Sequence, residues 1–157
     1  MTLLAYAARK FLAQQSDVTS LLGVDELGDP MIYVNHPGAT IENTQNSMIV
    51  LTVFDGWGAN NHNDARFPVL TVDIWSDPTR NSDGSVRRKD ADLKIEAVYK
   101  AVDRHLHQVS NSLPNGDYIF WDDERIISSS RQNEPSLRPA FDDEGAMMGT
   151  INYNVTI

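Results

Sequence analysis

Two stretches near the middle of the chain carry its clearest alternation of hydrophobic and polar positions. Across residues 67–76 the side chains alternate with period two, so that Leu70, Val72 and Ile74 share one face of a predicted strand. Across residues 91–109 the apolar positions instead recur at steps of three and four, which is typical of an amphipathic helix. We expect this helix to pack on the Leu70 face as a two-layer unit of helix on sheet. Its apolar stripe consists of Ala91, Ile95, Val98, Val102, Leu106 and Val109.

The opposite face of the predicted strand is mixed. Val69 and Trp75 lie at its ends, with Thr71 and Asp73 between them. A mixed face on a central strand indicates contact with something besides water. A second layer of the same subunit and an interface between subunits are both compatible with this pattern.

The flanking segments predict a mixed, mainly antiparallel sheet with a short helical segment at the N-terminus. Apolar residues between Leu4 and Leu12 lie on one side of a first helix, and a short second turn is expected to be capped by Asp17 and closed by Gly23. Asp90 is the expected N-cap of the long helix. Strands are expected at residues 31–34, 48–54, 118–121, 125–130 and 147–157, with a long loop at 133–145. The chain is therefore predicted to be a single α+β domain covering residues 1–157.

A Gly- and Asn-rich segment, residues 55–64, is expected to protrude as the loop of an antiparallel hairpin that joins the strand at 48–54 to the strand at 67–76. The first of these strands is apolar on both faces, which places it inside the sheet. Trp57 lies between two glycines, and a tryptophan on an exposed loop more often anchors a contact than fills a core, although a core position stays open. The expected assembly interface consists of Phe54, Trp57, Val69 and Trp75.

Composition narrows the class of protein. The 157-residue chain has no cysteine, which excludes disulfides, thiolate chemistry and cysteine-based zinc sites. A formal net charge of −9 and a pI near 4.7 make it a poor candidate for wrapping nucleic acid. Neither a signal peptide nor a membrane-spanning stretch is recognisable, so a cytoplasmic product with no membrane partner is expected.

Candidate catalytic and metal-binding patterns are weak. The histidines His36, His62, His105 and His107 are interpreted as solvated, because the last two face different ways on a helix and His62 lies on the protruding loop. Residues 79–90 only partly match a calcium loop, and a turn at Asp83 and Gly84 explains them adequately. We therefore expect neither catalytic residues, nor a bound metal, nor a cofactor.

Three blocks carry a family resemblance: residues 66–80 read RFPVLTVDIWSDPTR, residues 83–88 read DGSVRR, and residues 97–107 read AVYKAVDRHLH. Together with the order of elements, they resemble the tail terminator proteins of long-tailed bacteriophages, in the version found in phages of actinobacteria. The likeness covers about residues 2–109. Beyond that point, the chain agrees with the family only in being rich in predicted strands.

The resemblance implies a structural virion protein of the phage neck, assembled in the host cytoplasm and without enzymatic activity. Such proteins form a ring, usually a hexamer, that caps the finished tail tube and stops its polymerisation. The implied partners are other copies of the chain, the tail tube protein and the head-closure protein of the connector. DNA would pass through the lumen of the ring without specific binding.

Other readings remain open from the sequence. A different neck component, such as a head-closure or minor tail protein, is the nearest alternative. An acidic adaptor that binds a protein partner as a monomer is a less specific one. A small metal-dependent enzyme would use Asp55, His62 and Asp64 on the protruding loop.

Overall fold

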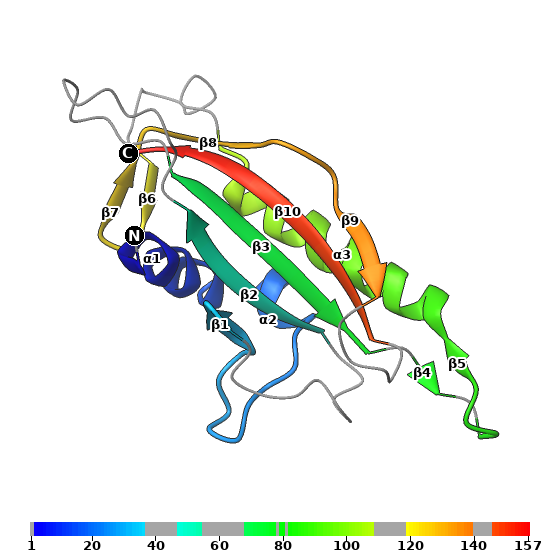
Figure 1. The fold of residues 1–157 in the computed structure, drawn as a ribbon. Coiled ribbons are helices and arrows are strands. Elements are labelled where there is room, and N and C mark those ends of the chain that lie inside the picture. The colour runs from blue at the N-terminus through cyan, green and yellow to red at the C-terminus, as the bar shows by residue number, and fades with distance from the viewer. Residues whose placement is uncertain are drawn as a thin grey trace.

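The fold is organised around a six-stranded mixed sheet (Figure 1). The computed structural model describes residues 2–36, 47–54, 68–77, 79–80, 82–108, 119–139 and 146–157. The main path through the sheet has the strand order β1-β2-β3-β10-β8, and β9 also pairs with β10. Only β1 and β2 run parallel; the other pairs in this sheet are antiparallel. The strands are β1 (Ile32–Val34), β2 (Ser47–Phe54), β3 (Val69–Ser76), β8 (Ser128–Arg131), β9 (Ser136–Pro139) and β10 (Met147–Thr156).

The predicted faces of β3 and its antiparallel pairing with β2 are confirmed, while the predicted protruding loop at 55–64 lies outside the described residues. In β3, Leu70, Val72 and Ile74 are fully buried, while the alternate positions are partly exposed. β2 pairs with β3 in antiparallel register and lies between β1 and β3, which explains why both of its faces are largely apolar. The α+β fold class predicted from the pattern is therefore the one observed.

The long helix α3 (Arg88–Leu106) packs on the Leu70 face. Its stripe from Ala91 to Leu106 is buried as predicted. The packing is close: a Cβ added to Gly149 of β10 would lie 2.7 Å from Cγ2 of Ile95. Since real Cβ atoms do not approach so closely, this position of β10 requires glycine for the helix to lie where it does.

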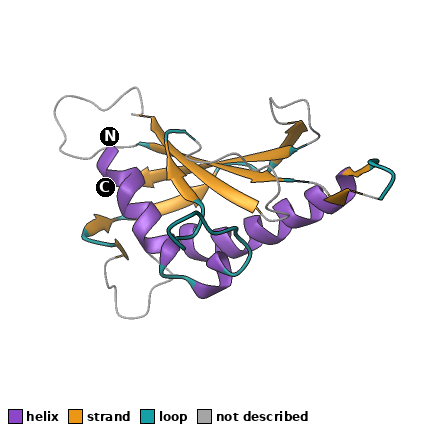
Figure 2. Ribbon diagram, turned by 90° about the horizontal axis from the view of Figure 1, so that it is seen from below, coloured by secondary structure: helices purple, strands orange, loops and turns teal. Residues whose placement is uncertain are grey.

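The N-terminal helix α1 (Thr2–Ala13) covers the same face of the sheet beside α3. In the view along the sheet the described helices lie on one side of the strands (Figure 2). Among the described helices, none is both long and apolar enough to cross a membrane. Smaller elements complete the fold: α2 (Ser16–Thr19), β4 (Thr79–Arg80), β5 (Val86–Arg87), β6 (Ile119–Trp121) and β7 (Glu124–Ile126).

Several predicted boundaries are wrong. The N-cap of α2 is Gln15 without a side-chain cap, so Asp17 lies inside the helix, and the helix ends at the C-cap Ser20 rather than at Gly23. Helix α3 begins at Arg88, so Asp90 lies in its first turn instead of capping it. Asp17 and Asp90 each stand within a residue or two of a helix start, where sequence alone resolves a cap poorly.

The strand pattern beyond α3 is also only partly as predicted. The segment expected as one strand at 125–130 is divided into β7 and β8, which belong to different sheets. The loop expected at 133–145 contains β9, an edge strand whose residues 136–138 are exposed. An exposed edge strand that ends in Pro139 lacks the alternation that identifies buried strands.

Candidate assembly surface

The mixed face of the sheet, here called the outer face, lies opposite the helices. It is formed by every second residue of β2, β3 and β10, which stand side by side in register. Phe54 pairs with Val69 at one end of this face. At the other end Trp75 stands between Met48 of β2 and Met148 of β10.

The Phe54 end is open to solvent. Phe54 is 59% exposed, and its cross-strand neighbour Val69 is half-buried. Apolar cross-strand pairs of this kind stabilise a sheet when they are covered. The structure therefore brings together two of the four predicted interface residues as one exposed apolar pair.

The Trp75 end is packed. Met31, Met48, Ala146 and Met148 are buried there, and Tyr33 and Trp75 pack against them as a second, smaller apolar cluster. About 20 Å of strand, at roughly 3.3 Å per residue, separates Trp75 from Val69. Trp75 and the Phe54–Val69 pair are thus not parts of one patch. Trp57, together with Asp55, His62 and Asp64, lies outside the residues that the structure describes.

Two polar atoms in the Trp75 cluster have no hydrogen-bond partner within the described part of the chain. They are the indole Nε1 of Trp75 and the hydroxyl oxygen of Tyr33, and both atoms are buried. Burial, together with the charge of Asp25, raises the pKa of the Tyr33 phenol. Both causes favour the neutral form of the phenol.

The polar side chains in the middle of the outer face hydrogen-bond to one another. Oγ1 of Thr71 lies 2.8 Å from Oδ1 of Asn152, and the hydroxyl of Thr150 donates to Oδ1 of Asp73 over 2.6 Å. Each pair joins residues that face one another across β3 and β10. Asp73, the one charged residue in the predicted strand, therefore has its hydrogen-bond partner within the subunit.

Of the histidines expected to be solvated, His36 and His107 are exposed as expected, whereas His105 is only partly exposed. Nε2 of His105 lies 2.8 Å from Oδ1 of Asp17, and the His105 ring meets Phe11 edge-on at 6.1 Å. Nδ1 of His107 accepts a hydrogen bond of 3.0 Å from the backbone N–H of Arg131. The interpretation is wrong for His105, because its partner Asp17 comes from a distant part of the chain, which no local pattern reveals.

A polar cluster joins α3 to the sheet. Oδ1 of Asp103 accepts a bond of 2.9 Å from the Tyr153 hydroxyl, and its Oδ2 lies 2.8 Å from Nη1 of Arg131. Arg131 also donates to the hydroxyl of Tyr99 and stacks over that ring, 5.5 Å from its centre. Burial and the neighbouring carboxylate raise the pKa of Tyr153 well above its usual range. Every polar group here is engaged by another, so the cluster fixes the helix rather than presenting a reactive group.

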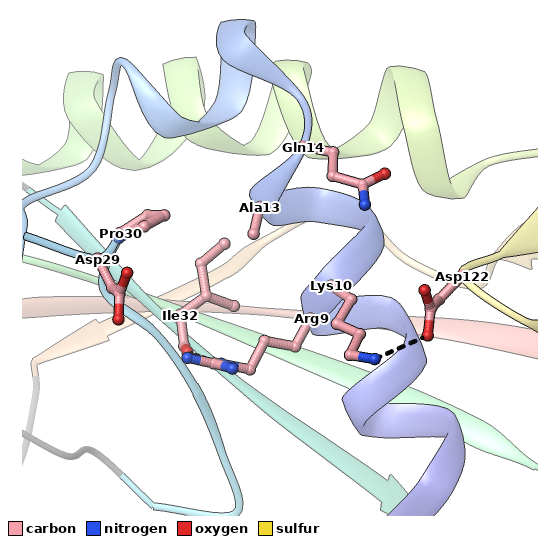
Figure 3. Close-up of a pocket in the computed structure, with 8 residues that line it drawn as sticks. All are labelled: Arg9, Lys10, Ala13, Gln14, Asp29, Pro30, Ile32 and Asp122. Atoms are coloured by element: carbon pink, nitrogen blue, oxygen red, sulfur yellow. Dashed lines mark hydrogen bonds and ion pairs between the residues drawn. The ribbon is translucent and has the colours of Figure 1, made fainter.

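An open hollow of about 410 Å³ lies between α1 and the chain that leads into β1 (Figure 3). Nε of Arg9 donates to the carbonyl of Ile32 over 2.7 Å, and Lys10 pairs with Asp122 at 3.1 Å. Both cations are thus already engaged at the rim of the hollow. Within the described residues, no three acidic, histidine or cysteine side chains gather as a metal site would need.

Comparison with known proteins adds a likeness in fold. No protein-family model matches the chain, and no curated protein matches it. Its fold is similar to a chain in the solved structure described as the virion of a native gene transfer agent (GTA) particle. The TM-score is 0.56 at 12% sequence identity, and the match covers 98% of this chain and 92% of that chain. At this identity the likeness establishes a shared fold over nearly the whole chain.

Proposed function

We propose that this protein is a structural component of a phage-like virion. The observation that carries the proposal is the fold shared with a chain of the gene transfer agent particle, since the match leaves almost none of either chain uncovered. The side chains support a structural role, because the polar clusters around Asp103 and on the outer face are internally bonded. In this proposal the protein acts by assembling and not by catalysis.

More specifically, the protein is a tail terminator. Residues 66–80 and 97–107 resemble that family in sequence, and the fold likeness to a virion chain is an independent line of support. The protein forms a ring on the finished tail tube, stops its growth and offers its other surface to the head-closure protein. The exposed Phe54–Val69 pair supports assembly, because such a pair gains stability when a neighbour covers it.

The charge of the chain suits a ring through which DNA passes. A formal net charge of −9 repels phosphates, so passing DNA is not retained. Sequence-specific binding of DNA is therefore not part of the proposed function.

The test is polymerisation of tail tube subunits from the same particle, with and without this protein. We expect the protein to bind one end of the tubes and to arrest their growth, which electron microscopy of tube lengths measures. Tubes that grow equally long with and without it would overturn the terminator role. Binding to the portal of filled heads, and not to tubes, would assign the protein to head closure instead.

A further inference from the structure

Four of the 13 Lys and Arg residues of this acidic chain lie on an arm at one end of the molecule. This basic arm, defined as residues 79–80 and 82–89, comprises the β4–β5 hairpin and the start of α3. It carries Arg80, Arg87, Arg88 and Lys89 against a single acidic residue, Asp83. The hairpin projects beyond the sheet in both views (Figures 1 and 2).

Hydrogen bonds hold the turn and the base of the arm. Oδ1 of Asp83 accepts bonds from the backbone N–H and the hydroxyl of Ser85, at 2.9 and 2.6 Å, and Gly84 takes a positive φ of 86°. At the base, Nζ of Lys94 donates to the carbonyl of Asp77 over 3.2 Å. The one carboxylate of the arm is therefore used in the turn, and the base of the arm is tied to the end of β3.

The opposite end of the molecule has the complementary character. The β6–β7 hairpin, with the residue after it, covers 119–127 and is here called the acidic hairpin, because it carries Asp122, Asp123 and Glu124 against Arg125. Two large apolar side chains flank the acidic turn in the open: Phe120 is 53% exposed and Ile127 is 42% exposed. Exposed apolar side chains rimmed by charge are typical of a surface that binds protein.

The acidic hairpin is anchored, so its exposed side chains are held in place. The Trp121 side chain is fully buried, stacks on Phe11 at 6.3 Å and approaches the Gln108 side chain with its Nε1 at 3.3 Å. Since residues alternate along a strand, this anchoring turns Phe120 outward. Gln108 lies two residues beyond the end of α3, so the acidic hairpin lies at the C-terminal end of that helix and the basic arm at its start. At 1.5 Å per residue, the 19-residue helix sets the two surfaces about 28 Å apart.

We propose that the basic arm of one copy of this chain docks on the acidic hairpin of a second copy, over Phe120 and Ile127. Charge complementarity selects this occupant, because the acidic hairpin repels an acidic chain as a whole and attracts its basic arm. The two surfaces do not overlap and lie at opposite ends, so the contact is head-to-tail and repeats from copy to copy, closing as a ring where the rotation allows. This inference rests on the proposed function, from which it takes the premise that copies of the chain associate.

The test is a charge exchange read by light scattering over a concentration series. Arg88→Glu with Lys89→Glu reverses the arm at the first turn of α3, where negative charge favours the helix dipole and folding is preserved. Asp123→Lys with Glu124→Lys reverses the hairpin and leaves the Lys10–Asp122 pair in place. We expect each variant alone to associate about tenfold more weakly or worse, and an equimolar mixture of the two to regain the wild-type mass. Lys100→Glu, an exposed lysine on the same helix, is the control and should leave the mass unchanged.

A second measurement uses the lack of natural cysteines. Ser82→Cys in the arm and Asp123→Cys in the acidic hairpin should form a disulfide-linked pair of chains when mixed and oxidised, at yields well above either variant alone. Leu27→Cys, 87% exposed on another loop, should not link to Ser82→Cys.

Variants that melt as the wild type does and keep the wild-type mass would overturn the contact, as would a wild type that is a single chain at every concentration. If the wild type binds DNA and the arm variant does not, while the mass of the assembly is unchanged, the contact would also be overturned. The arm would then be assigned to binding nucleic acid. Failure of this contact can be told apart from failure of the proposed function. If the charge-reversed variants keep the wild-type assembly mass and still arrest tail tubes, the protein is a terminator that assembles through other surfaces.

Discussion

One imidazole nitrogen of His105 reaches both oxygens of the Asp17 carboxylate, with Nε2 2.8 Å from Oδ1 and 2.9 Å from Oδ2. Nη2 of Arg104 lies 3.2 Å from the same carboxylate. The contact joins α2 to the last turn of α3, residues far apart in the chain. It ties the short helix to the long one at the end that carries the acidic hairpin.

This contact predicts a dependence of stability on pH. Burial acts to raise the pKa of Asp17, but the hydrogen bond from His105 and the charges of His105 and Arg104 hold it below the ordinary 3.8. Since the folded-state pKa is the lower one, the carboxylate stabilises the fold above the unfolded-state value and loses that contribution as the pH falls through the folded-state value. Asp17→Asn should therefore cost up to about 1 kcal/mol at pH 7, given the partial exposure of the pair. The difference from wild type should vanish once the pH falls below the lowered pKa of Asp17 in the folded state, as urea melts at several pH values will show.

Glu26→Gln, which removes an exposed carboxylate on the loop between α2 and β1, is the control for Asp17→Asn. It should follow the wild-type melts throughout. An Asp17→Asn difference that persists unchanged at pH 2 would argue that packing and not charge carries the effect.

Ile74→Asp should abolish the fold. Ile74 is fully buried on the helix-facing side of β3, and a carboxylate there has no partner to offset its desolvation. We expect loss of cooperative thermal unfolding, followed by circular dichroism. A soluble variant with a normal melting transition would show that the face assignment is wrong.

Gly149→Ala should destabilise the subunit by about 1–3 kcal/mol, because the added Cβ would force Ile95, and with it α3, away from the sheet. Denaturant midpoints measure this cost. Gly28→Ala is a contrast: no atom lies near its added Cβ, and its strain comes only from a positive φ of 84°. Equal stability of Gly149→Ala and wild type would mean that the helix shifts at no cost.

Phe54→Ala should leave the melting transition near the wild-type value, since its side chain is 59% exposed. If the Phe54 end of the outer face is an interface, the same change weakens association, which the light-scattering series measures.

Trp57→Ala is also expected to leave the fold intact and to weaken association, because Trp57 lies between two glycines in the sequence. Loss of cooperative melting in Trp57→Ala would place that tryptophan in the core instead.

The sequence revealed the elements whose burial is regular. The period of two around Ile74 and the steps of three and four from Ala91 to Leu106 sufficed to predict the strand, the helix and the face on which they meet. The edge strand β9 was not predicted. It pairs with β10, but its residues 136–138 are all exposed, so they show no alternation of buried and exposed positions.

Contacts between distant residues were beyond local patterns. His105 is one residue before the last of a helix, and nothing near it in the sequence indicates that Asp17 will be its partner. The acidic run at residues 122–124 is a second case. Only the structure shows that residues 122–124 stand between the exposed side chains of Phe120 and Ile127.

The bond from Arg9 to the carbonyl of Ile32 has a consequence for solubility. β1 is the outermost strand on its side of the sheet, and the carbonyl of Ile32 points away from β2, toward the position that an added strand would take. With a guanidinium on that oxygen, the edge is a poor template for strand-by-strand growth into fibrils. The bond therefore disfavours the joining of copies through this edge of their sheets.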